Sequence, residues 1–158
     1  MLPGVAGERY VIFTDASWVK GAAGVAAIGV DRVKGQWFVK AQRTHSNSVL
    51  EAELKAILLA LNWAVEEGRN EVIILSDSKI AIDALILAER PPEWKSSNIF
   101  FDIINVSKKL LVCNFFFISR SLNLLADGMA KSARVAEDQA VLYQGEGVPP
   151  VIPIVLSN

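Results

Sequence analysis

Two short apolar runs, each ending in an aspartate, constrain the fold of this chain more than any other feature. They are residues 10–15 (Tyr-Val-Ile-Phe-Thr-Asp) and residues 72–77 (Val-Ile-Ile-Leu-Ser-Asp). A continuous apolar run of this length is typical of a strand that is covered on both faces. Because a helical segment separates the two runs, a crossover connection would place them side by side and parallel. The runs therefore predict the centre of an α/β sheet with helices on its faces.

The segments around these runs complete the predicted sheet. Residues 25–30 and 36–43 indicate two more strands, and the short links between them favour an antiparallel meander with the first strand. A fifth strand is predicted for residues 113–118. Helices are predicted for residues 49–67, 80–88, 97–110 and 124–135. The prediction is thus a five-stranded mixed sheet, three antiparallel strands and then two parallel ones, flanked by helices.

The helix predicted for residues 49–67 begins with two glutamates that point in different directions. Ser48 and Glu51 have the spacing of a capping box, and Glu51 precedes Lys55 by four residues, so helix stability alone explains Glu51. Glu53 lies about 200° away around the helix, at the head of the apolar stripe that should face the core. A carboxylate there needs a partner or a metal. The ordinary alternative is an acid at the rim of the core that reaches water.

Four acids are candidates for one metal site. Asp15 and Asp77 end strands that are predicted to be neighbours, and α/β sheets bind ligands beyond the carboxyl ends of their strands. Glu53 begins a helix on the same sheet, and Asp127 lies one turn into the last helix. Clustered carboxylates need a counter-charge, which hard cations such as Mg²⁺ supply. Taken singly, the three aspartates are also explained as a turn residue, a helix cap and a first-turn acid.

Length and charge bound the class of protein. At 158 residues, the chain suits one domain with a sizeable core, and its net charge of −1 gives no overall basic character for tight nonspecific nucleic-acid binding. The single cysteine, Cys113, excludes an internal disulfide. With no visible signal peptide or membrane span, we expect an intracellular chain that is not membrane-bound. We predict an N-terminal arm at residues 1–8, a domain at 9–136 and a proline-containing arm or linker at 137–158.

Four motifs carry the acids in order along the chain. They are Phe13-Thr-Asp-Ala-Ser17, Ala52-Glu-Leu-Lys-Ala56, Leu75-Ser-Asp-Ser78 and Asn123-Leu-Leu-Ala-Asp-Gly-Met-Ala130. They resemble the motifs of type 1 ribonuclease H, most closely those of the ribonuclease H-like domains of plant non-LTR retroelements, which are associated with reverse transcriptases. The resemblance covers residues 9–135. It implies a ribonuclease H-like fold in which Asp15, Glu53, Asp77 and Asp127 hold two Mg²⁺ ions, for which Mn²⁺ can substitute.

The reaction implied by this resemblance is hydrolysis of the RNA strand of an RNA–DNA hybrid by an endonuclease with a two-metal-ion mechanism. The hybrid would be recognised by its shape and its 2′-hydroxyl groups. Five polar side chains near the acids are candidates for contacting the substrate: Ser17, Asn47, Ser78, Arg120 and Asn123. Arg120 can hold a phosphate, but it cannot act as a base because it stays protonated.

Two departures from the family leave an alternative open. Cellular ribonucleases H usually carry a histidine in the loop before the last acidic helix, but here that loop is residues 119–122 (Ser-Arg-Ser-Leu) and the only histidine is His45. The basic handle of some members is also missing, since only residues 89–96 join the two middle helices. Both departures predict weak hybrid affinity and a slow enzyme. The alternative is a catalytically weak or inactive module that binds nucleic acid or a protein partner.

A third hypothesis is compatible with both of these functions. The chain is then a domain of a reverse transcriptase polyprotein, and part of its surface contacts the polymerase. On this hypothesis Ile82, Ile86 and Leu87 lie off the inner face of their helix and, together with residues 148–156, are exposed in the isolated chain.

Overall fold

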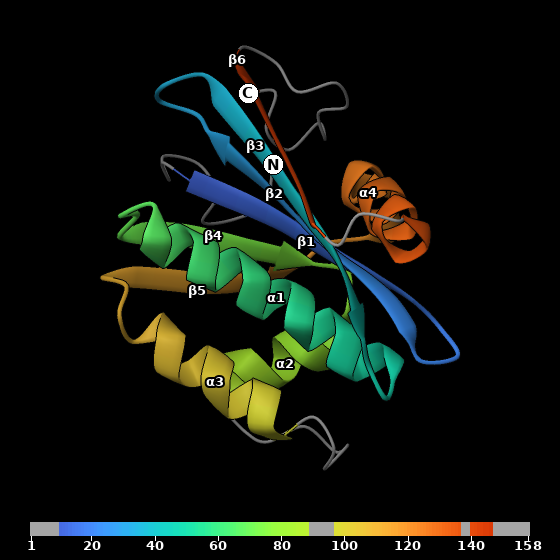
Figure 1. The fold of residues 1–158 in the computed structure, drawn as a ribbon. Coiled ribbons are helices and arrows are strands. Elements are labelled where there is room, and N and C mark those ends of the chain that lie inside the picture. The colour runs from blue at the N-terminus through green and yellow to red at the C-terminus, as the bar shows by residue number, and fades with distance from the viewer. Residues whose placement is uncertain (1–9, 89–96, 137–139, 147–158) are drawn as a thin grey trace.

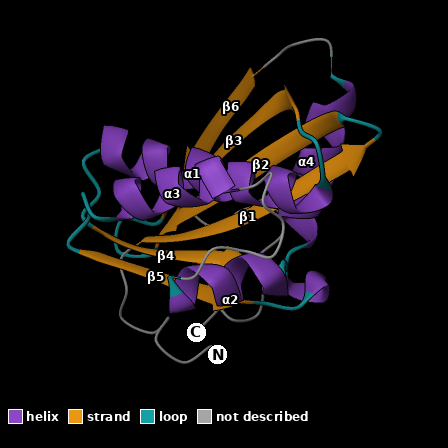
Figure 2. Ribbon diagram, turned by 90° about the horizontal axis from the view of Figure 1, so that it is seen from below, coloured by secondary structure: helices purple, strands orange, loops and turns teal. Residues whose placement is uncertain are grey.

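The computed structural model describes residues 10–88, 97–136 and 140–146. The strands are β1 (Tyr10–Val19), β2 (Ala22–Asp31), β3 (Gln36–His45), β4 (Glu71–Ser76), β5 (Val112–Phe117) and β6 (Ala140–Glu146). The helices are α1 (Val49–Glu66), α2 (Lys79–Leu87), α3 (Ser97–Ser107) and α4 (Leu124–Val135), with one 3₁₀ turn, η2 (Arg120–Leu122), before α4. The six strands form one sheet in the order β5-β4-β1-β2-β3-β6 (Figure 2).

The two apolar runs lie side by side at the centre of this sheet. β1 and β4 are parallel, with Tyr10 opposite Val72 and Thr14 opposite Ser76. β1, β2 and β3 form the antiparallel meander, and β5 adds to β4 in parallel. The α/β prediction and its central pair of parallel strands are therefore confirmed.

Both faces of the central strands are covered by helices. Figure 1 shows α1, α2 and α3 together on one side of the sheet and α4 alone on the other. Successive side chains of a strand point to opposite faces. Accordingly Ile12 packs in the core beneath α1, while Val11 and Phe13 pack in the core beneath α4. This two-sided burial is the reason that the run is continuously apolar rather than alternating.

The prediction of five strands is one strand short. β6 pairs antiparallel with β3 in a segment that was expected to be an extended arm. The prolines at positions 149, 150 and 153 led to that expectation, but they follow the paired residues. β6 covers the edge of β3, which would otherwise present unpaired backbone groups to solvent. The expected arm at residues 1–8 lies outside the described residues, as do residues 137–139 and 147–158 of the expected arm or linker at 137–158 and residues 89–96 between the middle helices.

β1 also continues past Asp15, where the sequence predicted its end. The parallel pairing with β4 stops at Thr14, whereas the antiparallel pairing with β2 extends to Val19. Asp15 therefore lies at the point where one neighbour of β1 ends, not at the end of the strand itself. This still leaves its side chain at the carboxyl edge of β4.

α2 is more deeply inserted than its sequence suggested. Ile82 was predicted to be exposed, but it is fully buried beside α1 and α3, while Ile86 and Leu87 are exposed as predicted. Ile82 shares the buried face of α2 with Ala81, Ala84 and Leu85. The polyprotein hypothesis itself stays a prediction. Among the described residues, no helix has the length and apolar character needed to cross a membrane.

A glycine in β2 lets α4 lie close to the sheet. A Cβ built on Gly24 would come within 2.0 Å of the Ala130 carbonyl oxygen and within 2.5 Å of the Arg134 backbone nitrogen. Only a residue without a side chain allows this approach. The contact fixes the distance of α4 from the sheet, and α4 carries Asp127.

Candidate metal centre

Three of the four predicted acids meet at the carboxyl edge of β4. Asp15 comes from β1, Glu53 from the first turns of α1, and Asp77 follows the last residue of β4. Each offers a carboxylate oxygen, and these oxygens all lie within 4.8 Å of one another. The register explains the meeting of the two aspartates, because each directly follows the last parallel pair, Thr14 and Ser76.

The cluster has fewer hydrogen-bond donors than its buried oxygens need. Glu53 is only 6 % exposed. Its Oε1 accepts a hydrogen bond from the Ala16 backbone N–H at 3.1 Å, but its Oε2 has no donor within the described part of the chain. Oδ2 of Asp77 is buried and lacks a donor in the same way. Buried carboxylate oxygens without a partner are costly, and an all-oxygen donor set suits a hard divalent cation. These residues therefore fit a metal ion.

Burial and mutual repulsion make the cluster hold protons in the absence of a cation. The pKa of Asp15 is raised from 3.8 to about 7, first by its burial and then by the Asp77 carboxylate. The pKa of Glu53 is raised well above its ordinary value, again by burial first and then by Asp15. A bound cation reverses this effect, because it favours the charged form of each ligand.

Asp127 lies beside the cluster but is not one of the three. It is close enough for its charge to raise the pKa of Asp15 further. Its own Oδ2 lies 3.0 Å from the Lys131 Nζ, one turn further along α4. The structure thus brings Asp15, Glu53 and Asp77 together and holds Asp127 at their side, paired with a lysine. The role of each acid as a metal ligand stays a prediction.

Asn123 connects the start of α4 to the strand that carries Asp15. It occupies the N-cap position of α4, but its side chain makes no capping hydrogen bond. Instead the buried side-chain amide donates to the Thr14 carbonyl oxygen at 2.9 Å, and the Asp127 backbone N–H donates to the Asn123 carbonyl oxygen. Asn123 therefore positions Asp127 next to Asp15. No local sequence signal predicts this contact, since it joins residues more than a hundred positions apart.

Glu51 has the contacts of a structural acid, as its helix face predicted. It pairs with Lys55 at 3.3 Å, and its backbone N–H donates to the Ser48 hydroxyl. The capping box differs in one respect, because Glu51 Oε2 accepts from Asn47, both backbone and side chain, rather than from Ser48. Glu51 is also buried, at 7 % exposed. The two glutamates thus differ in their partners and not in their burial.

The predicted substrate contacts already have partners within the protein, with one exception. The Ser17 hydroxyl accepts a hydrogen bond from Arg134 Nε at 2.9 Å, and the Ser78 hydroxyl caps α2 by accepting from the Ala81 N–H. Asn47 donates to Glu51. Arg120 is exposed in η2, and its side chain makes no hydrogen bond or ion pair within the ranges that the structure describes. Their roles in binding a substrate stay predictions.

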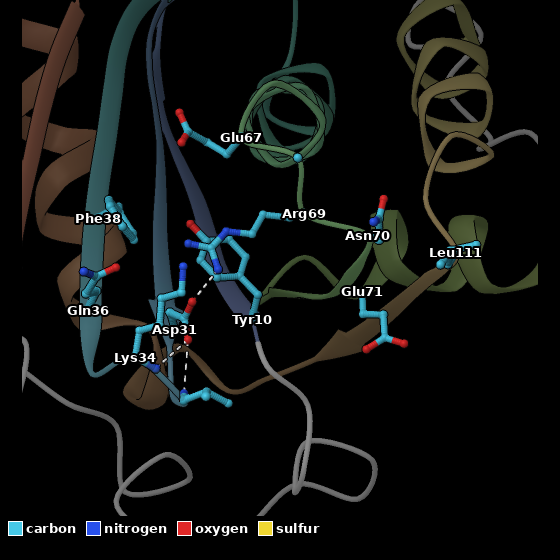
Figure 3. Close-up of a pocket in the computed structure, with 12 residues that line it drawn as sticks. Tyr10, Asp31, Lys34, Gln36, Phe38, Glu67, Arg69, Asn70, Glu71 and Leu111 are labelled. Atoms are coloured by element: carbon cyan, nitrogen blue, oxygen red, sulfur yellow. Dashed lines mark hydrogen bonds and ion pairs between the residues drawn. The ribbon is translucent and has the colours of Figure 1, made fainter.

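A cavity of about 670 Å³ lies at the opposite end of the sheet from the acids. Tyr10 and Glu71, at the starts of β1 and β4, line it (Figure 3). Five or six residues of strand separate its lining from the cluster, roughly 16–20 Å. Asp31 accepts from two backbone N–H groups of the β2–β3 turn and pairs with Arg69, which stacks over the Tyr10 ring at 4.1 Å. These polar groups hold the turn in place, so the cavity is not part of the candidate metal centre.

Solved structures with the same architecture identify the fold. Ribonuclease H1 from Halobacterium salinarum NRC-1 is 18% identical and has a TM-score of 0.73, with 79% of this chain and 96% of that chain covered. An N-terminal RNase H domain from Mycobacterium tuberculosis is 20% identical and has a TM-score of 0.74, covering 80% and 94%. LC11-RNase H1, solved in complex with an RNA/DNA hybrid, is 18% identical and has a TM-score of 0.70, covering 78% and 95%. The chain therefore has the RNase H-like fold that its motifs implied.

The family follows from the sequence itself. A family model described as reverse transcriptase-like matches residues 13–133, and this protein belongs to that family. The matched segment contains the three clustered acids, Asp127 and Asn123. A comparison with curated proteins found no sequence match. β6 begins beyond the matched residues.

Proposed function

We propose that the protein is a metal-dependent endonuclease that hydrolyses the RNA strand of RNA–DNA hybrids. One observation carries this proposal. Three carboxylates from three separate elements converge within 4.8 Å, and two of their buried oxygens lack donors. An acid with a purely structural role finds local donors, as Glu51 does. The RNase H-like fold supports the choice of reaction.

In this proposal Asp15, Glu53 and Asp77 hold divalent metal, and Asp127 completes the site for a second ion. Two Mg²⁺ ions, or Mn²⁺ in their place, supply an activated water and stabilise the departing 3′ oxygen. The chain itself provides the rigid frame. The Ala16 N–H fixes Glu53, and Asn123 holds the start of α4 against β1. Such preorganisation is what allows a charged site to act without rearranging during the reaction.

We propose the RNA–DNA hybrid as the substrate because the shape of this duplex is what a protein can recognise. A protein recognises such a duplex through its groove width and 2′-hydroxyl groups rather than its sequence. The complex of LC11-RNase H1 with an RNA/DNA hybrid shows that a protein of this fold binds one. On this chain, Ser17 lies on β1, while Asn47, Ser78 and Asn123 lie just before α1, α2 and α4. Arg120 offers an exposed cation for a phosphate.

The test is a cleavage assay with matched substrates. RNA–DNA hybrid, single-stranded RNA, double-stranded RNA and double-stranded DNA of one sequence are incubated with the protein in Mg²⁺, in Mn²⁺ and in chelator. We expect cleavage of the RNA strand of the hybrid alone, with either ion and not with chelator. A folded protein that leaves the hybrid intact in both ions would refute the enzymatic proposal.

A second candidate is a module that binds nucleic acid without cleaving it. The contact of Asp127 with Lys131 favours it, because a cation of the protein already lies beside this acid and competes with a metal. The absence of a histidine from residues 119–122 points the same way. Binding of the hybrid with no cleavage in Mg²⁺ or Mn²⁺ would establish this function in place of the first.

A further inference from the structure

Three cations follow one another from the acids to the end of α4, two on the helix and one on β3. The first is Lys131, whose Nζ is 3.0 Å from Asp127 Oδ2. The second is Arg134, whose Nε donates to the Ser17 hydroxyl at 2.9 Å. The third is Arg43 of β3, whose Nη1 donates to the carbonyl oxygen of Ala136, the residue after the helix, at 2.7 Å. We call these three residues the α4 row.

The geometry of the helix places the row on the same side as Asp127. Residues four and seven positions further along a helix lie on the same face. With a rise of 1.5 Å per residue, Lys131 lies about 6 Å and Arg134 about 10 Å beyond Asp127 along the axis. A nucleic-acid strand carries one charge per about 3.4 Å of duplex axis. The stretch of α4 from Asp127 to Arg134 therefore matches roughly three nucleotides of a strand.

The row is held in place by the sheet as well as by the helix. Arg134 bonds to Ser17, two residues beyond Asp15 on the same strand. Gly24 lets β2 lie against the backbone of Ala130 and Arg134, at a distance that leaves no room for a Cβ. The cations and the acid cluster thus belong to one rigid body.

Most of the positive charge of the row remains unneutralised. The partners of the two arginines are a hydroxyl and a carbonyl, which carry no charge, and no carboxylate in the described ranges forms an ion pair with either arginine. The side chain of Lys131 is 63 % exposed, and an ion pair at such a position is worth little. A chain with a net charge of −1 therefore concentrates free positive charge next to its acids.

We infer that the strand to be cleaved runs from the acid cluster along the last two turns of α4, with its phosphates held by Lys131, Arg134 and Arg43. The inference rests on the proposed function and adds the path of the substrate. It also gives this chain a means of holding a polyanion without overall basic character. Phosphate contacts of this kind fix the register of a strand and carry no sequence preference.

The test measures how hybrid binding depends on salt. Binding of a fluorescent RNA–DNA hybrid is followed by anisotropy in Mg²⁺ between about 50 and 200 mM salt, in a Glu53→Gln background that prevents cleavage. Each lost phosphate contact should lower the slope of log K against log salt by about 1. We expect this change for Arg134→Gln, Lys131→Gln and Arg43→Gln. Arg134→Lys should keep the slope, because it keeps the charge.

The control is Lys108→Gln. Lys108 is exposed just after α3, at the end of the sheet away from the acids, so its loss should leave the slope unchanged. If the parent binds the hybrid and the α4 row variants keep its slope, or if Lys108→Gln lowers the slope equally, the inference is wrong and the proposed function stands. If the Glu53→Gln parent binds no hybrid at low salt, both the inference and the proposed function are wrong. Should Arg134→Gln fail to fold, the exposed Lys131 carries the same test.

Discussion

At the scale of single residues, Glu51 and Glu53 show what distinguishes a structural acid from a functional one. Both are buried on α1 and lie two residues apart. Glu51 is surrounded by Lys55, Asn47 and the helix cap, whereas Glu53 faces Asp15 and keeps one oxygen without a donor. Partners, rather than exposure, separate the two roles.

Exchanging each glutamate for glutamine tests this distinction. Glu53→Gln should abolish metal-dependent cleavage of the hybrid and, at a pH where Glu53 is ionised, slightly raise the melting temperature without metal, because a repelling charge is gone. Glu51→Gln should keep activity and lower the free energy of unfolding by less than about 1 kcal/mol. Cleavage rates and urea denaturation of both variants provide the comparison. Equal loss of activity in the two would show that the assignment of helix faces is wrong.

The raised pKa of Asp15 predicts how the metal-free protein responds to pH. The folded state keeps its proton up to about pH 7, whereas the unfolded chain loses it near pH 3.8. The unfolded state therefore binds fewer protons in this window, and stability falls as pH rises through it. In chelator, the melting temperature of the wild type should fall as pH rises. The melting temperature of Asp15→Asn should change less over the same pH range. A wild-type curve parallel to that of Asp15→Asn would contradict the prediction.

A bound metal ion should reverse this loss of stability with rising pH, and a variant of Asp77 tests it. Millimolar Mg²⁺ or Mn²⁺ should raise the melting temperature, since a ligand that binds only the folded state stabilises it. The rise should be greater at about pH 8 than at about pH 6, because binding requires deprotonated ligands. Asp77→Asn should weaken the rise and yet increase the melting temperature in chelator. A wild-type curve that neither ion shifts would be strong evidence against a working site.

At the scale of elements, the sequence predicted the types of strand and the positions of the helices better than it predicted where the strands end. The parallel pairing of β1 with β4 followed from two apolar runs, and α1 begins at Val49 as its cap predicted. The true end of β1 was missed because residues 15–19 lie beyond β4 and pair with β2 alone. A strand with one neighbour on that stretch loses its continuous apolar pattern, and with it the signal in the sequence.

Gly24 offers a test of how α4 is placed. Gly24→Ala should lower the free energy of unfolding by about 3 kcal/mol, because its Cβ meets helix backbone that cannot move aside. Gly128→Ala in α4 is the matched control. It has open space around its Cβ and should stabilise the protein by roughly 0.5–1 kcal/mol. Urea denaturation measures both, and a neutral Gly24→Ala would mean that the close packing of α4 on β2 is not needed.

At the scale of the whole molecule, β6 extends the sheet at the edge farthest from β5. It pairs with β3 along seven residues and brings Gly145 under the Trp37 ring, where a Cβ would lie 2.4 Å from a ring carbon. The acids lie on the other side of β2 and β3. β6 is therefore expected to serve stability rather than catalysis.

Shortening the chain tests the role of β6. A chain ending at residue 136 should melt at a lower temperature and associate at high concentration, because the edge of β3 is exposed. Its metal-dependent cleavage of the hybrid at low temperature should persist. A chain ending at residue 146 keeps β6 and should behave like the full chain. The two chains are compared by thermal melts and size-exclusion chromatography. Equal melting temperatures would show that β6 does not stabilise the fold.

The sequence by itself determined the class of fold, the central strands, the different directions of the two glutamates on α1, and the three acids that cluster. These depend on periodicity, capping and the order of motifs, which act over a few residues. Tertiary structure alone decided that β6 joins the sheet and that Ser17 is held by Arg134. The last of these joins residues 117 positions apart. Such contacts depend on how close two packed elements come and on which rotamers fill the space between them, and no short-range pattern encodes either.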